Sequence, residues 1–146
     1  MLYNEAMKAE QILISKINES YWWHVPPQDN SAYKKRGKFL ASTYNQASFY
    51  GRPNSEPEKV SVQKPLWSDS EEDILKMLFP DNYTEKLEVV VNAGKDYYNQ
   101  RIKLDAQMYQ RAKELGYDAI VLLGSTGLKE LGSNRKPRSI ELNLCI

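Results

Sequence analysis

Strand-like segments near both ends of this chain, with helical segments between them, constrain its fold most strongly. Residues 21–25 are aromatic and β-branched, and residues 39–42 form a second short run that begins with apolar side chains. Near the other end, residues 118–123 are almost continuously apolar, and residues 140–146 alternate apolar and polar side chains. This order predicts an α+β fold with a mixed or antiparallel sheet, because regular βαβ winding would alternate strands and helices along the whole chain.

Apolar residues that recur at intervals of three and four predict the helices. The first is an amphipathic helix over residues 1–20. A Ser-Asp-Ser-Glu capping box at residues 68–71 opens another, which Pro80 ends. Further helices are expected over residues 84–93 and in the segment that stops at Gly116. The residues that carry the pattern are Leu2, Ala6, Ala9, Leu13 and Ile17; Ile74, Leu75, Leu78 and Phe79; and Leu104, Met108, Ala112 and Leu115.

Two connecting segments also carry a pattern. Residues 59–63 alternate polar and apolar side chains, which predicts a half-buried strand that Pro65 stops. Residues 124–138 are rich in Gly, Ser, Lys and Arg, which predicts a long loop before the last strand.

Length and composition restrict the class of protein. A chain of 146 residues with 41% hydrophobic side chains is expected to form one domain, residues 1–146, around one core. Its 20 basic and 19 acidic residues give no bulk charge for nucleic acid or membranes. One cysteine and one histidine argue against a disulfide framework and against a metal site. Without a signal peptide or a membrane-length apolar run, we expect a cytoplasmic protein that does not bind membranes.

Two titratable residues in the predicted strands are candidates for chemistry. His24 either orients a ligand hydroxyl or is a strand residue whose imidazole is satisfied within the protein. Glu141 lies between Ile140 and Leu142, so its carboxylate points away from their apolar side chains, toward solvent or a cleft. Solvent is the default for a charged residue on such a strand, and the long loop before it shifts the balance only a little toward a cleft, because loops beside strand ends often form binding sites.

The segment between these two residues contains a possible slot for a flat ring. Tyr44 and Tyr50 flank the small polar residues 45–48, and a planar ligand could stack on either ring, although core or surface filling is the simpler interpretation. The basic residues of segment 34–38 would suit phosphate or form an ordinary solvated surface. Residues 124–127 lack the spacing and the lysine of a phosphate-binding P-loop.

The run Gly-Lys-Phe-Leu-Ala-Ser at residues 37–42, followed by Ala-Ser-Phe-Tyr at residues 47–50, resembles a known signature. It is the Gly-x-Tyr-Phe-Ala-Asp … Ser-Ala-x-Tyr pattern of poly- and mono-ADP-ribosyltransferases of the diphtheria-toxin type, with the same spacing from Gly37 to Tyr50. Three later segments are similar to compact bacterial and phage members of that fold: residues 60–66, 115–121 and 139–142. The resemblance covers residues 21–146 and leaves out the N-terminal helix.

The resemblance implies a fold and a set of roles. The fold would be a split, strongly bent mixed or antiparallel β-sheet with flanking helices, and NAD would be the substrate. Glu141 would be the catalytic residue, accepting a hydrogen bond from the 2′-hydroxyl of the nicotinamide ribose. Tyr50 would stack on nicotinamide, Phe39 would take the place of a second aromatic residue, and His24 would hold the ribose on the adenosine side.

The chain departs from the family pattern at the positions that hold the nicotinamide amide. Val25 replaces a glycine whose backbone normally clamps that amide. Ala47 replaces the serine that normally hydrogen-bonds it, with Ser48 adjacent. Phe39 also lacks the hydroxyl of the usual tyrosine.

The resemblance predicts an NAD-dependent ADP-ribosyltransferase that modifies a macromolecular target, with protein favoured over nucleic acid, as a toxin-type or phage-encoded effector. The loop of residues 125–138 would read the target through Lys129, Arg135, Lys136 and Arg138. The altered positions leave open a catalytically inactive module that docks on a partner protein. The basic segments leave open a nucleic-acid-processing member of the fold, since RNA 2′-phosphotransferases share it.

Overall fold

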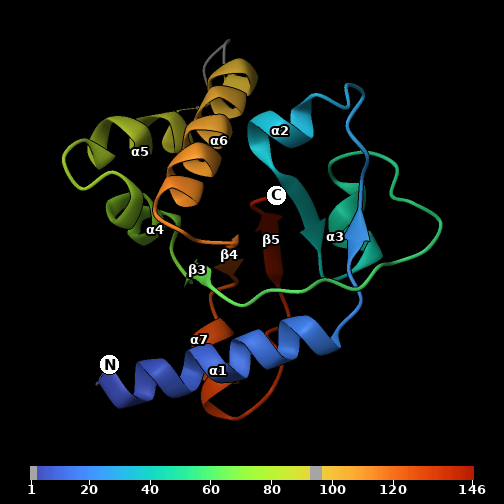
Figure 1. Cartoon of the computed structure of the whole chain (residues 1–146), viewed down its shortest axis with the longest axis vertical. Helices are drawn as coiled ribbons and strands as arrows, with labels where there is room; N and C mark the ends of the chain where they lie inside the picture. The colour runs from blue at the N-terminus through green and yellow to red at the C-terminus, as the bar shows by residue number, and fades with distance from the viewer. Residues whose placement is uncertain (1–2, 93–96) are drawn as a thin grey trace.

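Five strands form one mixed sheet in the computed structural model, in the order β1-β2-β5-β4-β3 (Figure 1). The structure describes residues 3–92 and 97–146. Strands β3 and β4 pair in parallel and the other neighbours are antiparallel. The α+β class is therefore confirmed, but hydrogen bonds join all five described strands, so the sheet is not split into two halves. The strands are β1 (Trp23–His24), β2 (Lys38–Ala41), β3 (Pro65–Ser68), β4 (Ala119–Leu123) and β5 (Ile140–Leu144).

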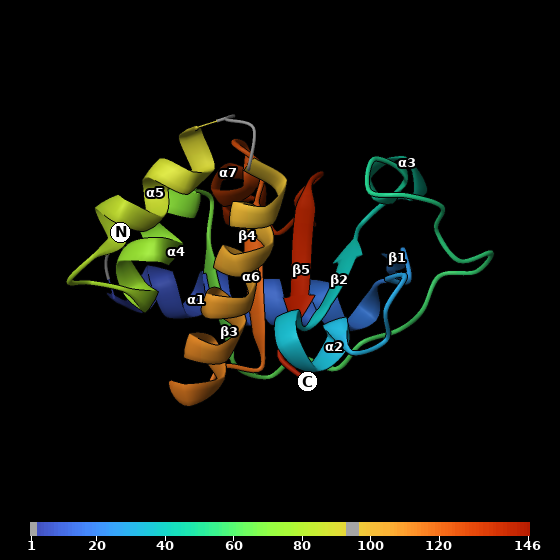
Figure 2. The ribbon, with the colours of Figure 1, turned by 90° about the horizontal axis from the view of Figure 1, so that it is seen from above.

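Helices lie on both faces of this sheet (Figure 2). Those expected near residues 1–20, 71–79, 84–93 and before Gly116 are confirmed, although Leu2 and Ala93 lie outside the described residues. Ser70, rather than Ser68, caps α4, since its hydroxyl accepts the Asp73 N–H. No helix in the described ranges is long and apolar enough to cross a membrane. The helices are α1 (Tyr3–Glu19), α2 (Ala32–Arg36), α3 (Tyr44–Ser48), α4 (Glu71–Leu78), α5 (Tyr83–Val91), α6 (Tyr97–Glu114) and α7 (Gly127–Gly132).

Alternating side chains divide the core between the two faces of the sheet. On the face that we call the α1 face, helices α1 and α7 pack on the central strands. On the opposite face, the α6 face, helices α4 and α6 pack mainly on β3 and β4. The buried residues of the α1 face include Leu13, Ile17, Leu131, Leu40, Val121, Ile140 and Leu142, and those of the α6 face include Ile74, Leu75, Leu78, Leu104, Met108, Leu66 and Ile120.

The α6 face stays partly open over β2 and β5. Phe39 on β2 is 45% exposed, and Glu141 on β5 is also exposed. In antiparallel register, Phe39 lies opposite Asn143, and Ala41 lies opposite Glu141, so these side chains share the α6 face. The uncovered part of the sheet therefore carries two of the residues that the sequence singled out.

The prediction of a strand over residues 59–63 is wrong, although buried and exposed side chains do alternate there as expected. Val62 is fully buried while Ser61 and Gln63 are exposed. Side chains take the place of a neighbouring strand here: the Asn18 amide accepts the Val62 N–H at 2.7 Å and donates to the Val62 carbonyl at 2.8 Å. The actual strand begins at Pro65, the residue that was expected to stop it. Burial of every second residue thus indicates an extended backbone. It does not indicate which groups form hydrogen bonds with the N–H and C=O groups of that backbone.

Replacing Asn18 with alanine should destabilise the fold by about 2 kcal/mol, because it leaves the N–H and C=O of Val62 without their partners. Urea denaturation would measure the change in the free energy of unfolding. Gln63→Ala is the matched control, since the Gln63 side chain is exposed. A difference of less than about 0.5 kcal/mol between the two variants would contradict this role for Asn18.

The segment of residues 124–138, expected as a loop, contains α7. Gly127 allows the helix to start directly against β4, because a Cβ at this position would lie 2.6 Å from the Cβ of Leu123. The buried Glu130 links the two ends of this segment by hydrogen bonds. Its carboxylate accepts hydrogen bonds from the Thr126 hydroxyl at 2.8 Å and the Arg138 N–H at 3.2 Å. The backbone just before β5 is therefore held in place by the hydrogen bond from the Arg138 N–H to Glu130.

Candidate functional site

Tyr50 and Glu141 meet on the open part of the α6 face. Glu141 is the second residue of β5, and Tyr50 follows the short helix α3, which Thr43 caps by accepting the Gln46 N–H. The Tyr50 hydroxyl donates a hydrogen bond to Oε1 of Glu141 at 3.2 Å. The two residues are 91 positions apart in sequence, so only the pairing of β2 with β5 brings them together.

A pocket of about 230 Å³ opens beside this hydrogen bond. Its lining consists of Ala41, Gln46, Phe49, Tyr50 and Glu141. Phe49 is 88% exposed and Tyr50 is 72% exposed, which is unusual for residues with such large aromatic side chains. Two accessible aromatic rings next to one carboxylate form a site that suits a flat ring with positive charge.

The environment of Tyr50 keeps its hydroxyl protonated. Partial burial of the hydroxyl, followed by the negative charge of Glu141 and the hydrogen bond to it, raises the pKa of Tyr50 to about 12. Because the ordinary value is 10.0, the neutral hydroxyl favours the folded state below pH 10, and this contribution is lost as the pH rises through about 12. Tyr50 thus remains a hydrogen-bond donor to Glu141 throughout the neutral range.

Replacing Glu141 with glutamine should lower the pKa of Tyr50 toward 10, because it removes the negative charge beside the hydroxyl. NMR titration of tyrosine-labelled protein would show this shift, with the Tyr50 signal assigned from Tyr50→Phe. Glu56→Gln, a change on an exposed loop, should leave the titration unaltered. An unchanged Tyr50 pKa in Glu141→Gln would show that the two side chains do not interact in solution.

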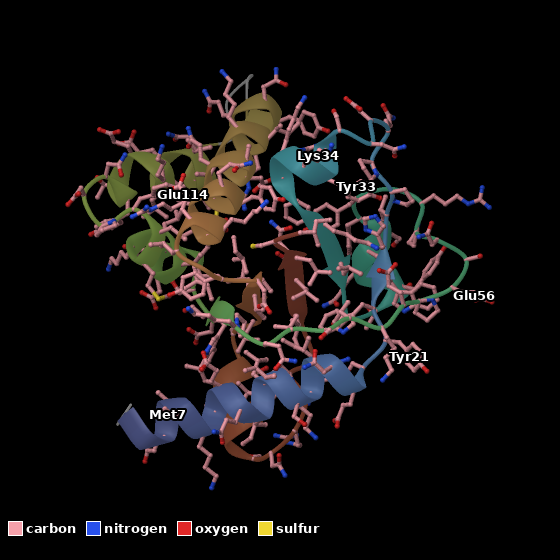
Figure 3. All side chains as sticks on the ribbon, viewed as in Figure 1. Met7, Tyr21, Tyr33, Lys34, Glu56 and Glu114 are labelled. Atoms are coloured by element: carbon pink, nitrogen blue, oxygen red, sulfur yellow. The ribbon has the colours of Figure 1, made fainter. Side chains whose placement is uncertain are left out.

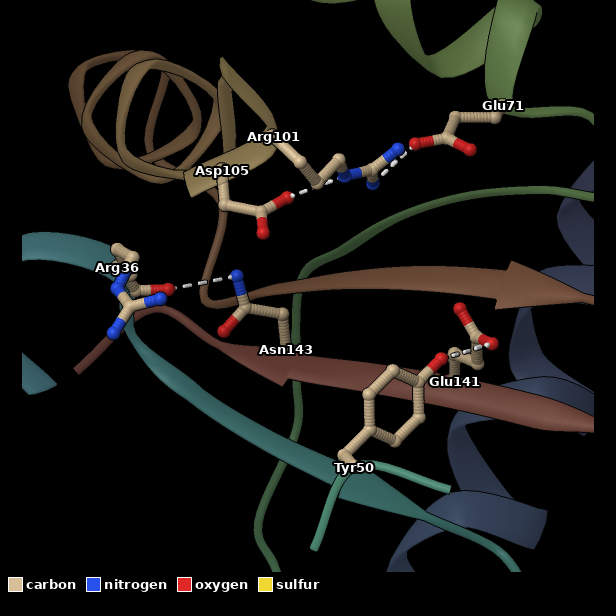
Figure 4. A network of polar contacts seen from close by, with 7 residues as sticks. All are labelled: Arg36, Tyr50, Glu71, Arg101, Asp105, Glu141 and Asn143. Carbon is tan, nitrogen blue, oxygen red and sulfur yellow. Dashed lines mark hydrogen bonds and ion pairs between the residues drawn. The ribbon is translucent and has the colours of Figure 1, made fainter. Parts of the chain in front are cut away.

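Glu141 also lines a second, smaller recess of about 60 Å³. Figure 4 shows the polar side chains around it. Arg101 on α6 forms an ion pair with Asp105, one turn later, at 3.1 Å, and another with Glu71 at the start of α4. Phe39 and Leu142 are among the apolar residues of its wall. Glu141 therefore lines both the pocket and the recess.

Charge in this recess is unevenly balanced. Three carboxylates, from Glu71, Asp105 and Glu141, line it with a single guanidinium, from Arg101. Burial opposes the charged form of Arg101, but Asp105 and Glu71 outweigh it and raise its pKa. Burial raises the pKa of Asp105, although Arg101 acts in the opposite direction. The site as a whole favours positive charge near Glu141.

Gly37, the first residue of the signature, has a steric reason to be glycine. Its φ of +79° favours glycine, and a Cβ there would overlap Oδ1 of Asn143. Asn143 is buried, and its amide Nδ2 donates to the Arg36 carbonyl at 3.0 Å (Figure 4). Gly37 thus lets the end of α2 pack closely on β5 beside the recess.

His24 does not share the pocket with Tyr50 and Glu141. It lies opposite Leu40, whereas Glu141 shares a row with Ala41 and Trp23, so His24 belongs to the α1 face. The imidazole is buried, with Nδ1 at 2.7 Å from the Phe39 carbonyl and Nε2 at 2.8 Å from the Tyr33 hydroxyl. Because a carbonyl can only accept, Nδ1 carries a proton toward Phe39, and in the neutral imidazole Nε2 then accepts from Tyr33, which projects from α2 (Figure 3). The imidazole is satisfied within the protein.

The remaining predicted residues divide in the same way. Phe39 lines the recess beside Glu141. Val25 lies against Gly51, where an added Cβ would be 2.8 Å from its Cγ1, and it does not line the pocket. Ser48 is exposed and donates to the Asn45 carbonyl at 2.7 Å. The structure therefore brings together Phe39, Tyr50 and Glu141, and leaves His24, Val25 and Ser48 outside.

Sequence reasoning missed the other polar residues of the site. Arg101 and Asp105 carry a detectable signal, an opposite-charge pair four residues apart on a predicted helix, but such pairs are common on surfaces. The sequence pattern indicates Glu71 only as part of a helix cap. Gln46 carries no signal beyond its place among the small polar residues, because its hydrogen bond to Ser139 spans 93 positions.

Comparison with known proteins adds no further assignment: no protein-family model, no curated protein and no solved structure matches this chain.

Proposed function

We propose that the chain is an NAD-dependent ADP-ribosyltransferase of the diphtheria-toxin type that modifies a macromolecular target. The observation that carries the proposal is the Tyr50–Glu141 hydrogen bond of 3.2 Å beside an open aromatic pocket. The resemblance assigns nicotinamide stacking and catalysis to these same two positions. In this proposal the continuous five-stranded sheet is a reduced form of the family's split sheet.

The pocket provides what this reaction needs. Breaking the bond between nicotinamide and ribose builds positive charge on the sugar, and a fixed carboxylate stabilises that charge more than it stabilises the neutral sugar. Glu141 supplies the carboxylate, and its Oε2 would accept a hydrogen bond from the ribose 2′-hydroxyl while Oε1 keeps the one from Tyr50. The exposed rings of Tyr50 and Phe49 provide the stacking surface for nicotinamide. The excess of carboxylates around Glu141 strengthens the preference for a cation.

His24 has a different role in this proposal from the one that the resemblance implies. It does not contact NAD but fixes the Phe39 carbonyl, and through it the position of β2, from the opposite face. The target would approach over the connection between β4 and β5, where Arg138 is largely exposed and Lys129, Arg135 and Lys136 add positive charge. An acidic protein surface fits this charge, in an effector of the toxin or phage type acting in the cytoplasm.

The test is incubation with labelled NAD and a bacterial lysate. The expected result is release of nicotinamide and transfer of label to a macromolecule, both lost in Glu141→Ala. If the folded protein releases no nicotinamide and transfers no label, and Glu141→Ala behaves as the parent does, the proposal is wrong.

An inactive docking module is the second candidate, favoured by the positions of His24, Val25 and Ser48 outside the pocket. Calorimetric titration with NAD distinguishes the two. Micromolar binding that Tyr50→Ala removes would count against a role in docking alone.

A further inference from the structure

We propose that Gln46 recognises the carboxamide of the ring that enters the Tyr50–Glu141 pocket. The inference rests on the proposed function and goes beyond it, because it assigns the amide-reading role to a residue that neither the resemblance nor the sequence pattern selects. Gln46 lies on α3 and lines the pocket together with Tyr50 and Glu141.

Hydrogen bonds at both ends fix the Gln46 side chain. Its Oε1 accepts from the Ser42 hydroxyl at 2.6 Å, and its Nε2 donates to the Ser139 hydroxyl at 3.0 Å. Ser42 follows β2 and Ser139 precedes β5, so the amide is held between the two strands that frame the pocket. A side chain that is ordered before binding loses little entropy when a ligand arrives.

Counting donors leaves Gln46 as the available partner for a carbonyl oxygen. A primary amide has two N–H donors, and within the described residues only one of those on Gln46 has a partner, Ser139. Among the other side chains that line the pocket, Glu141 only accepts, and the Tyr50 hydroxyl already donates to Glu141. The second N–H of Gln46 is therefore the free side-chain donor of the pocket wall.

The residues expected to bind the amide cannot perform this function from their positions. Val25 does not line the pocket, the Ala47 side chain has no polar atom, and the Ser48 hydroxyl donates to its own helix. A hydrogen bond from Gln46 to the ring carboxamide would fix the rotation of the ring against Tyr50. It would thereby hold the adjoining sugar next to Glu141.

The experiment compares the affinity for NAD with the affinity for its analogue that carries a carboxylate in place of the ring carboxamide. Gln46→Met should weaken NAD binding three- to tenfold, the usual range for one hydrogen bond. Gln46→Glu should weaken binding of the carboxylate analogue at least tenfold more than binding of NAD, because two carboxylates would then face each other. If Gln46 has only a structural role, its replacement would weaken the binding of both ligands equally. Thermal melting checks that each variant is folded.

Gln63→Glu makes the same chemical change at an exposed position and should leave both affinities unchanged. Ser139→Ala keeps the Gln46 amide but removes the hydroxyl that accepts from its Nε2. This variant should lose less affinity for NAD than Gln46→Met. If the Gln46 variants bind NAD as the parent does, with an unchanged ratio between the two ligands, the inference is overturned while the proposed function stands. If the parent itself binds no NAD, both are overturned.

Discussion

Replacing Glu141 with glutamine should lower the rate of nicotinamide release from NAD about a thousandfold. Opposite charges about 4 Å apart attract by roughly 4 kcal/mol at an effective dielectric near 20, and this energy corresponds to about three powers of ten in rate. Glutamine keeps the size of the side chain and an oxygen that can accept the ribose hydroxyl. The loss should therefore appear in kcat, with KM nearly unchanged, because the charge matters mainly in the transition state.

Steady-state kinetics of nicotinamide release would measure this effect. Glu56→Gln removes the same charge from the exposed loop between α3 and β3 and should leave the rate unaltered (Figure 3). A loss of less than tenfold in Glu141→Gln would exclude a catalytic role for this carboxylate. Equal losses in both variants would point instead to bulk charge.

Replacing Trp22 with alanine should destabilise the fold by about 4 kcal/mol. The Trp22 ring is completely buried in the core of the α1 face, and its Nε1–H donates to the Ile17 carbonyl at 3.0 Å, near the end of α1. Alanine would leave a cavity and remove one of the two hydrogen bonds that the Ile17 carbonyl accepts, the other coming from the Ser20 N–H. Buried Trp-to-Ala changes typically cost about 3–5 kcal/mol. Chemical denaturation would measure the loss in the free energy of unfolding.

The adjacent Trp23 is the matched control for this prediction. It is half-buried, with its ring packed edge-on against Tyr44 at a centroid distance of 5.2 Å on the side of α3. Trp23→Ala should cost about 1–2 kcal/mol, in proportion to the smaller apolar area removed from water. Similar losses in the two variants would contradict the assignment of these neighbours to different environments.

The fold could largely be predicted from local patterns. The helical spacing that ends at Ile17 and the apolar run before Gly124 correspond to α1 and β4, because each pattern reflects burial on one face. The wrong prediction of a strand at residues 59–63 also comes from a burial pattern. Val62 is buried as in a strand, but its backbone forms hydrogen bonds with the side chain of Asn18. Local sequence does not reveal partners 44 positions away.

The candidate site could be predicted only in part. The spacing between Gly37 and Tyr50 is local, and in the structure Tyr50 lies two residues beyond the end of α3. Whether a strand residue faces the cleft depends on register, and register places His24 on the opposite face from Glu141. The contact of Gln46 with Ser139 spans 93 positions and has no local signature.

The central position of β5 determines when the candidate cleft can form during protein synthesis. Strands β2 and β4 do not pair with each other, and β5 hydrogen-bonds to both, although it is the last of the five in chain order. As the chain leaves the ribosome, the β1–β2 and β3–β4 pairs emerge first, without a strand to join them and without the carboxylate that would complete the pocket. The sheet can be completed, and the cleft assembled, only once residues 140–144 are available to pair with both β2 and β4. A nascent chain that has not yet released β5 holds Tyr50 and Arg101 but has no site in which they can act together.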